Sequence, residues 1–215
     1  MENKLNEFTV PLNSGASITG IFPTPIYKKN INRALTDSEL KAADPGSWSL
    51  RPGSDNFRAD TTTVLNSPAF FGIKNFINSC IADFSKEILA PSTDCNLYIT
   101  QSWINFNKKG DKHHQHFHAN SIVSGVFYLN TANPGMLSFY IPQRSQIHIM
   151  NTPNWWNMRR IGFPVNTGDV VLFMSDLDHG VETQLADDHT RVSLAFNTWF
   201  KGEIGSKEGL TQLTQ

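Results

Sequence analysis

The sequence predicts a mainly β fold with flanking helices, arranged as an antiparallel double sheet of the jelly-roll type. Two observations favour it. After Pro91, short segments rich in Val, Ile, Phe and Tyr follow one another and are bounded by Gly, Pro or Asn, a composition typical of strands and turns. One long helical pattern precedes them, and a helix followed by a series of short strands is typical of a double sheet covered on one face.

Length and charge limit the kind of protein. A chain of 215 residues suits one domain, which we expect over residues 21–205 with a helical N-terminal part, behind a flexible lead or single edge strand over residues 1–20. The formal net charge of -1 favours neither nucleic acid nor an anionic membrane as a partner. No apolar run approaches the roughly 20 residues that cross a bilayer. Without a CxxC pair or a secretory leader, the chain is expected in the cytoplasm.

The N-terminal part alternates between extended and helical signals. Two prolines in Ile21-Phe22-Pro23-Thr24-Pro25-Ile26-Tyr27 favour an extended chain and exclude helix. Thr36-Asp37-Ser38-Glu39 has the pattern of a capping box and predicts a short helix, which Pro45-Gly46 would end. The segment from Trp48 to Asn66 is rich in turn residues and is expected to expose its arginines, Arg51 and Arg58.

A longer helix is predicted over residues 68–89. Ser67 suits the N-cap and Pro68 the first helical position, and Pro91 ends the pattern. Apolar residues recur every three or four positions, as expected of a helix that covers a sheet: Phe70, Ile73, Ile77, Ile81, Phe84 and Ile88. Cys80 lies near this apolar face, where a free thiol is expected to pack rather than react.

Alternation predicts strands in the rest of the chain. Between Leu97 and Asn107, Trp103, Asn105 and Asn107 share one face and the apolar residues between them share the other. Further strands are expected at Ile122–Asn130, Met136–Ile141, Val170–Met174 and Thr190–Phe200. Residues 142–164 lack clear periodicity and suggest a long loop over the mouth of a barrel. Its Trp155, Trp156, Arg159 and Arg160 fit either a contact surface or an exposed turn.

A run of histidines is the first candidate for a metal site. His113, His114, His116 and His118 lie within six residues, and the chain has seven histidines in all. Residues two apart on a strand face the same side, so a strand would direct His116 and His118 toward one point. His179, which follows the apolar strand ending at Met174, is the natural third ligand. His113 and His114 are expected to be solvated, and His148 and His189 to lie on the surface.

An arginine lies twelve residues after His179. On its predicted strand Arg191, Ser193, Ala195 and Asn197 share one face. A guanidinium that points into a barrel is costly unless it meets an anion, and its planar fork matches a carboxylate. These residues therefore suggest a small dicarboxylate held between Arg191 and a metal. Taken alone, Arg191 would be expected to pair with a carboxylate of the barrel wall, but His179 twelve positions earlier and Ser193 two positions later favour the bound anion.

This combination resembles the Fe(II)/2-oxoglutarate-dependent dioxygenases, which carry His-x-Asp/Glu, a distal His and an Arg-x-Ser pair on a double-stranded β-helix, a cupin-like jelly roll. The resemblance implies that His116 and His179 bind Fe(II) and that Arg191 and Ser193 bind the cosubstrate 2-oxoglutarate. Phe127-Tyr128-Leu129-Asn130 is similar to a strand of the prolyl-hydroxylase-like branch, which gives Tyr128 a role in holding the distal carboxylate.

Within this superfamily the chain is most similar to a bacterial and phage group with a His-x-His core. The likeness extends over about residues 21 to 200 and rests on Phe22-Pro23-Thr24-Pro25, Trp103-Ile104-Asn105, His116-Phe117-His118-Ala119-Asn120-Ser121, Ser124-Gly125 and Arg191-Val192-Ser193 through Asn197. It implies a bacterial protein or one made in a phage-infected host cell. Asn105, a polar residue on the inner face of its strand, is a candidate for a hydrogen bond to the cosubstrate or to the backbone of a metal ligand.

One position departs from the superfamily. His118 stands where the pattern has Asp or Glu, so the site has either three imidazole ligands or two with a water and His118 behind them. The subgroup resemblance favours His118 as a ligand. Asp176 and Asp178 lie close to His179 in the sequence and offer oxygen ligands, but neither matches the family's position.

The resemblance implies an oxygenase that hydroxylates a C–H bond of a small-molecule or peptide substrate, consumes dioxygen and releases succinate and CO₂. Two other classes stay open: a cupin-type metalloenzyme that uses the histidines without 2-oxoglutarate, and a non-catalytic jelly-roll binding protein. The Arg191-x-Ser193 pair separates the oxygenase from the cupin-type enzyme, because a cupin enzyme needs no carboxylate clamp there. The sequence leaves open a homodimer.

Overall fold

Two antiparallel sheets form the body of the protein, as the sequence predicts. The computed structural model describes residues 8–53, 55–131, 135–141, 152, 154–185 and 190–215. The larger sheet has the order β3 (Ile26–Asn30), β11 (Asp169–Met174), β8 (Val123–Asn130), β13 (Arg191–Ile204), β6 (Cys95–Asn107), β5 (Phe57–Ala59) and β4 (Leu50–Pro52), with β14 (Leu213–Thr214) on β13. The smaller has the order β10 (Arg160–Val165), β9 (Gly135–Tyr140), β12 (His179–Val181) and β7 (His113–His116).

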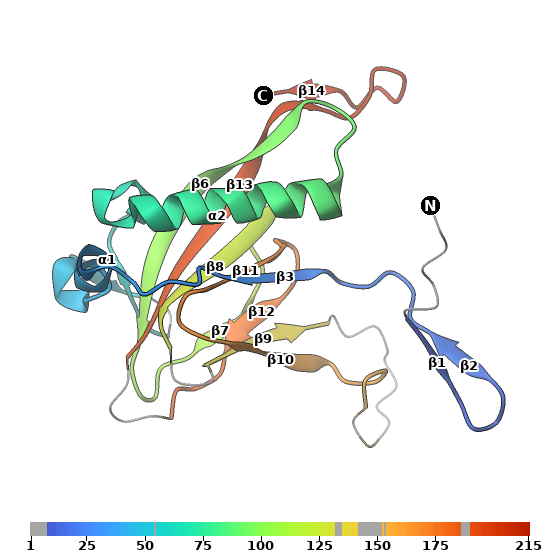
Figure 1. Ribbon diagram of the computed structural model, residues 1–215, viewed down its shortest axis with the longest axis horizontal. Coiled ribbons are helices and arrows are strands. Elements are labelled where there is room, and N and C mark those ends of the chain that lie inside the picture. Colours follow the sequence, from blue (N-terminus) through green and yellow to red (C-terminus); the bar gives the residue numbers. More distant parts are fainter. Residues whose placement is uncertain (1–7, 54, 132–134, 142–151, 153, 186–189) are drawn as a thin grey trace.

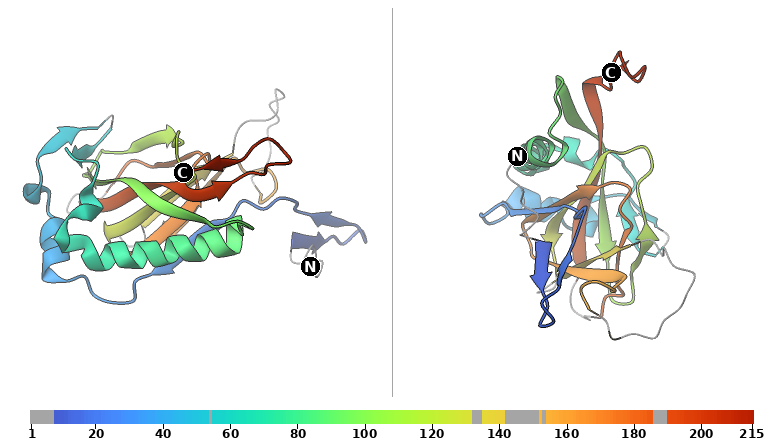
Figure 2. Two further views of the ribbon diagram at one scale, coloured as in Figure 1. Left: turned by 90° about the horizontal axis from the view of Figure 1, so that it is seen from above. Right: turned by 90° about the vertical axis from the view of Figure 1, so that its right-hand side faces the viewer.

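The helices cover the outer face of the larger sheet (Figures 1 and 2). The predicted helix over residues 68–89 is confirmed as three successive pieces: a 3₁₀ turn (η4, Pro68–Phe70), α2 (Phe71–Phe84) and a π turn (η5, Ser85–Leu89). Smaller pieces precede it: α1 (Asp37–Ala42), η2 (Pro45–Ser47) and η3 (Val64–Asn66). Among the described residues no helix is long and apolar enough to cross a membrane.

Two apolar clusters follow from the alternation of the central strands. The larger lies between α2 and the sheet and includes Ile77, Phe84, Phe106 and Phe196, together with Cys80, whose thiol packs as predicted. The other cluster lies between the two sheets and joins Val126, Tyr128, Leu137, Phe139, Val165, Val171, Phe173 and Ala195. Residues of even and odd position along one strand therefore serve different layers, and the layer between the sheets is where inward-facing polar residues can meet.

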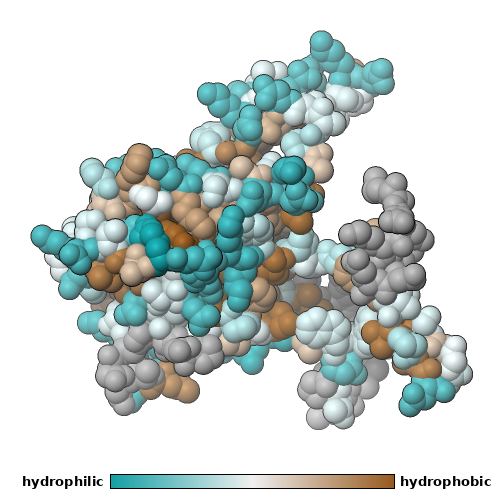
Figure 3. All heavy atoms as spheres, viewed as in Figure 1, coloured by the Kyte–Doolittle hydropathy of each residue, from teal (hydrophilic) through white to brown (hydrophobic). Residues whose placement is uncertain are grey.

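The N-terminal part differs from the predicted lead or single strand. It has two short strands, β1 (Thr9–Pro11) and β2 (Ser17–Thr19), which among the described strands pair only with each other and which project from the body (Figure 1). The apolar side chains of this hairpin, Val10, Leu12 and Ile18, are exposed. Hydrophobic atoms are visible on the projecting hairpin in Figure 3.

The predicted strands are confirmed at β6, β8, β9, β11 and β13, but the predicted loop over residues 142–164 is wrong at its end. There β10 begins at Arg160 and pairs with β9 along its length. Its residues alternate poorly because most of them stay exposed. Residues 142–151 and 153 lie outside the described residues, and Trp155 and Trp156 are exposed.

The capping box of α1 is confirmed, and its glutamate has a second partner. Thr36 and Glu39 each accept the other's backbone N–H, at 2.8 Å for the bond to Glu39 Oε2 and 3.3 Å for the bond to Thr36 Oγ1. Arg33 also donates both terminal nitrogens to the Glu39 carboxylate, at 2.7 and 2.8 Å. Glu39 is 2% exposed. The hydrogen bonds from Arg33 hold the pKa of Glu39 below its usual value.

We expect Glu39→Gln to lower the free energy of unfolding by about 2 kcal/mol at pH 7, because one charge-assisted bond is lost and an amide N–H faces the guanidinium. A carboxyl with a lowered folded pKa stabilises the protein fully above its unfolded pKa, about 4.3, and loses this contribution as the pH falls through the folded value. Urea unfolding from pH 7 to pH 3 should therefore show the two proteins converging. A constant difference at every pH would contradict this role.

Candidate metal and cosubstrate site

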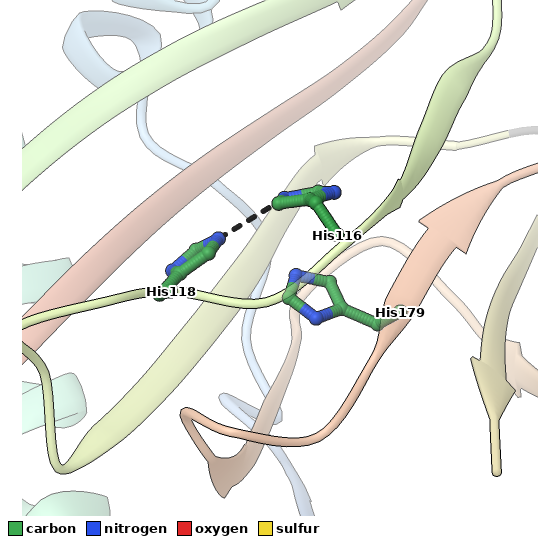
Figure 4. A group of neighbouring side chains, drawn as sticks. All are labelled: His116, His118 and His179. Carbon is green, nitrogen blue, oxygen red and sulfur yellow. Dashed lines mark hydrogen bonds between the residues drawn. The ribbon is translucent and has the colours of Figure 1, made fainter. Parts of the chain in front are cut away.

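Three histidines from three segments converge between the sheets. His116 ends β7 and His179 begins β12, and the two are direct partners in the antiparallel ladder, so their side chains share one face. His118 reaches the same point from the chain beyond β7 (Figure 4). One ligand nitrogen of each ring lies within 4.8 Å of those of the other two. The structure thus brings together the three histidines that the sequence singles out.

The sequence predicts that alternation along a strand directs His118 toward His116. The His118 ring does lie beside His116, but the predicted cause is wrong. The strand ends at His116, so alternation along a strand does not orient His118. Its backbone N–H donates to the carbonyl of Ser175 at 2.9 Å, and its Nδ1 lies 2.5 Å from Asn197 Oδ1 and 2.9 Å from Ser124 Oγ. Contacts distant in the sequence therefore place this ring, and no local pattern could have revealed them.

All three rings are held with Nδ1 against an oxygen acceptor. His116 Nδ1 lies 2.8 Å from the His114 carbonyl and His179 Nδ1 lies 2.9 Å from the Leu177 carbonyl, while His118 uses Asn197. A carbonyl oxygen can only accept, so Nδ1 carries the hydrogen in each ring and Nε2 keeps its lone pair for a metal.

The spacing of these lone pairs fits a metal ion. His116 Nε2 and His118 Nε2 are 3.1 Å apart, the contact drawn in Figure 4. With both hydrogens on Nδ1, neither atom is a donor, so the two lone pairs repel each other unless a cation lies between them. Two ligands at right angles, each about 2.1 Å from one metal, are about 3 Å apart. The donor set therefore fits a divalent ion.

The rings are also in the charge state that a metal requires. Burial lowers the pKa of His179 to about 3, and it lowers the pKa values of His116 and His118 as well. Neutral imidazoles are the ligating form, so at neutral pH protons compete little with a metal for this site. His179 is 4% exposed.

A buried cation, Arg191, lines the same small cavity as the three histidines. Arg191 is 2% exposed, and burial lowers its pKa. Its Nη1 donates to the Met136 carbonyl at 2.7 Å, and its guanidinium lies 5.0 Å from the centre of the Tyr128 ring. Arg191 Nε and the Tyr128 hydroxyl have no hydrogen-bond partner among the described residues. An arginine so buried, without a carboxylate in the described part of the chain, indicates a place for an anion.

The cavity in front of Arg191 has room for one acidic group. Its walls include the three histidines, Tyr128, Asn105, Arg191 and Ser193, and its volume is about 30 Å³. One buried water needs about 10–15 Å³, so the space suits about two waters or one carboxylate. Asn105 and Ser193 are buried and face each other across the β6–β13 pair. The predicted faces of both strands are therefore confirmed.

A wider pocket opens on the other side of the histidines. It has a volume of about 400 Å³ and shares Trp103, Asn105, His113, His116 and His118 with the inner cavity, whereas His179 lines the inner cavity and not this pocket. His113 lines both spaces and stacks on His116 at 4.5 Å, so the expectation that it is solvated is wrong. Burial lowers its pKa to about 4. His114 is exposed, as expected, and pairs with Asp55.

Other candidates from the sequence take no part in this group. Asp178 accepts a hydrogen bond from Gln115 at 2.8 Å, Asp176 is exposed, and neither belongs to the metal-binding group found among the described residues. His148 and His189 lie outside the described residues. Asn197, which the sequence places on the face of Arg191 without a role, is the residue that sequence reasoning undervalued.

We expect Asn197→Leu to weaken metal binding by about 10- to 100-fold, because it removes the acceptor that fixes the tautomer and orientation of His118. Asn197→Asp keeps an acceptor and should bind metal as well as the wild type does. Competition titration with cobalt(II) measures both affinities without any turnover. Equal metal affinity in the leucine variant and the wild type would contradict this positioning role.

Comparison with known proteins agrees with the site. A family model described as "Putative 2OG-Fe(II) oxygenase" matches residues 101–197, which include all three histidines and Arg191. No curated protein matches the chain.

Several solved structures share the fold. A 2OG-Fe(II) oxygenase family oxidoreductase from Burkholderia pseudomallei is 18% identical, with 75% of this chain and 76% of that chain covered and a TM-score of 0.52. HygX from Streptomyces hygroscopicus, solved with nickel, 2-oxoglutarate and hygromycin B, is 11% identical, with coverage of 81% and 82% and a TM-score of 0.55. A Pseudomonas putida prolyl-4-hydroxylase is 14% identical, with coverage of 81% and 92% and a TM-score of 0.50. Residues 101–197 of this chain therefore resemble the 2OG-Fe(II) oxygenase family, and the fold and the group of three histidines agree with that likeness.

Proposed function

We propose that this enzyme hydroxylates a C–H bond of a small-molecule or peptide substrate. One C–H bond, one dioxygen and one 2-oxoglutarate would give one C–OH group, succinate and CO₂. The observation that carries the proposal is the pairing of two features in one cavity: three neutral histidines with converging lone pairs, and a buried arginine without an acidic partner among the described residues. A metal site and a carboxylate site so close together fit an α-keto dicarboxylate that spans both.

The residues divide into two groups in this proposal. His116, His118 and His179 hold iron(II) as a three-imidazole set, with Asn197 and two backbone carbonyls fixing their orientation. Arg191 and Tyr128 donate to the distal carboxylate of 2-oxoglutarate. Burial raises the pKa of Tyr128 to about 12, so its hydroxyl keeps its proton and serves as a donor at neutral pH. Ser193 and Asn105 line the path between the two ends and offer further hydrogen bonds.

Iron(II) with 2-oxoglutarate supplies the activation of dioxygen that, together with decarboxylation of the cosubstrate, oxidises the C–H bond. The protein's part is to bind, to orient and to exclude water. Apolar walls from Val126, Leu137 and Ala195 surround the inner cavity and keep water from the distal carboxylate. The wider outer pocket lies on the open side of the histidines, where a substrate can approach them.

We further propose a cytoplasmic location. Cys80 and Cys95 are both free, and Cys80 is buried, as expected of a protein that keeps its thiols reduced.

The test is a measurement of succinate. We expect protein loaded with iron(II) to release one succinate for each 2-oxoglutarate consumed, to lose this turnover when a chelator removes the metal, and to regain it when iron(II) is returned. Without added substrate, we expect slow consumption of 2-oxoglutarate that is not coupled to substrate oxidation. Binding of 2-oxoglutarate to the manganese(II) form, measured by calorimetry, is an independent test. Metal-dependent oxygen uptake without consumption of 2-oxoglutarate would instead favour the cupin-type alternative. If 2-oxoglutarate did not bind to the manganese(II) form, the proposed function would be wrong.

A further inference from the structure

Unpaired donors mark the outer pocket as well as the inner cavity. Four buried side-chain nitrogen or oxygen atoms lack a hydrogen-bond partner among the described residues. Two of them, Arg191 Nε and the Tyr128 hydroxyl, lie at the inner end and have their explanation in the distal carboxylate of the cosubstrate. The other two, Asn56 Nδ2 and Arg58 Nε, belong to side chains that line the outer pocket. Since unpaired buried donors are rare, this second pair needs a ligand of its own.

The sheet directs Arg58 toward the histidines. Arg58 lies in β5 directly opposite Asn105 of β6, and Asn105 lies opposite Ser193 of β13. Direct partners in antiparallel strands project to the same face, so Arg58 continues the inward-facing row of Asn105 and Ser193 out to the rim of the pocket. This pocket also contains His116 and His118. Arg58 is half-buried and not exposed as the sequence suggests.

The charge of Arg58 is not balanced by its neighbours. The two described carboxylates of the same hairpin are engaged elsewhere: Asp55 lies 3.1 Å from His114, and Asp60 lies 3.3 Å from Arg51. Arg58 itself makes no ion pair within the part of the chain that the structure describes. It is also the one arginine or lysine among the described residues that line this pocket.

We propose that Arg58 and Asn56 bind a carboxylate group of the enzyme's substrate, so that the enzyme acts on an acid. This inference rests on the proposed function, because it concerns the substrate of the same site. One guanidinium and one amide supply the donors that a single carboxylate accepts. A phosphate dianion would find only one fixed positive charge. The outer anchor then holds the acid at the rim, while the rest of the substrate extends across Trp103 toward the histidines.

The probes are N-acetyl derivatives of the twenty amino acids, each as free acid and as primary amide, together with O-phosphorylated N-acetylserine amide. Each is titrated by calorimetry into the manganese(II) form saturated with 2-oxoglutarate, without oxygen. We expect at least one acid to bind about tenfold or more tightly than its amide, as for a charge-assisted pair. Arg58→Gln should remove this preference. Arg51→Gln, which changes the neighbouring arginine of β4 that is already paired with Asp60, should keep it.

Two further readings make the outcome decisive. Affinity for 2-oxoglutarate should be the same in the wild type and in Arg58→Gln. Equal affinity would show that the variant is folded and that Arg191 and Tyr128 still bind the cosubstrate. The ¹⁵N–¹H signal of Arg58 Nε, identified by its loss in the variant, should move on addition of the preferred acid and stay in place with its amide.

Failure has two distinct forms. If 2-oxoglutarate does not bind the wild type, the proposed function fails. If 2-oxoglutarate binds but every acid matches its amide, or Arg58→Gln keeps the preference, the function stands and this inference is wrong. Binding that depends on Arg58 but is strongest for the phosphorylated probe would overturn the assignment of a carboxylate.

Discussion

Replacing His118 by alanine is expected to lower the affinity for iron(II) by at least about 100-fold and to abolish detectable release of succinate. Mutation of a residue that only hydrogen-bonds and orients a metal ligand lowers metal affinity by about 10- to 100-fold, so loss of a ligand itself should lower it at least as much. The measurement is a competition titration with cobalt(II) or iron(II) without oxygen. It tests directly whether the imidazole that stands in the carboxylate position of the superfamily holds the metal.

The neighbouring His114 offers a matched control. His114→Ala removes an imidazole from the same run, but this ring is exposed and does not belong to the ligating group, although it lies 5.2 Å from the His116 ring. The substitution keeps the His114 backbone carbonyl that His116 contacts. We expect its metal affinity to stay close to that of the wild type. If His118→Ala bound metal as tightly as His114→Ala does, water would complete the coordination and His118 would act behind it.

A third imidazole in place of a carboxylate has a physical consequence. Three neutral ligands leave the charge of an iron(II) site one unit more positive than two imidazoles and a carboxylate do. Asp178 is close enough for its charge to act on His116, but neither it nor the exposed Asp176 belongs to the ligating group, so no carboxylate among the described residues takes the place of the missing ligand. The net positive site strengthens the attraction for the acidic end of 2-oxoglutarate, and it agrees with a substrate that also carries a carboxylate.

The local pattern of the sequence predicts the strands and their faces well. Alternation in β6 and β13 places Asn105, Ser193 and Arg191 on the inner face, because side chains of successive residues must point to opposite sides of a sheet. The helix over residues 68–89 follows from its apolar spacing in the same way. The strand faces and the helix can be predicted because each depends only on the spacing of residues within one segment of the chain.

Features that depend on pairing between distant segments escape such reasoning. His118 is oriented by Asn197 and Ser124, and although both residues belong to motifs that carry the resemblance, no local pattern links either of them to His118. Arg58 faces the pocket only because β5 pairs with β6 in one register, in a region where turn residues hide the strand. His113 is half-buried because β7 bulges against β12, which brings it onto His116. Long-range register decided each of these positions.

Replacing Arg191 by methionine is expected to weaken binding of 2-oxoglutarate by about 100-fold or more. A guanidinium that donates two charge-assisted bonds to a carboxylate contributes about 3 kcal/mol or more, and about 1.4 kcal/mol corresponds to a tenfold change in affinity. Calorimetric titration of the manganese(II) form measures the loss. Metal affinity should not change, since Arg191 donates to the Met136 carbonyl and is not part of the group of histidines.

The same substitution should leave the ligand-free protein as stable as before. Arg191 is a buried cation with one described hydrogen bond, and replacing such a charge by an apolar side chain of similar length is often neutral or stabilising by about 1–4 kcal/mol. We therefore expect urea unfolding of the metal-free protein to show no loss greater than about 1 kcal/mol, the cost of the unpaired Met136 carbonyl.

Tyr128→Phe and Arg191→Lys refine this expectation. The first keeps the ring beneath the guanidinium and removes only the hydroxyl, so its loss of affinity should be smaller, about tenfold. The second keeps the charge but loses the planar fork, and it should bind 2-oxoglutarate better than the methionine variant and less well than the wild type. A role for Arg191 in folding alone predicts the opposite pattern: reduced stability in Arg191→Met, with unchanged affinity for 2-oxoglutarate in the fraction that remains folded. Because stability and affinity move in different directions under the two roles, the two measurements together decide between an arginine kept for its ligand and one kept for the core.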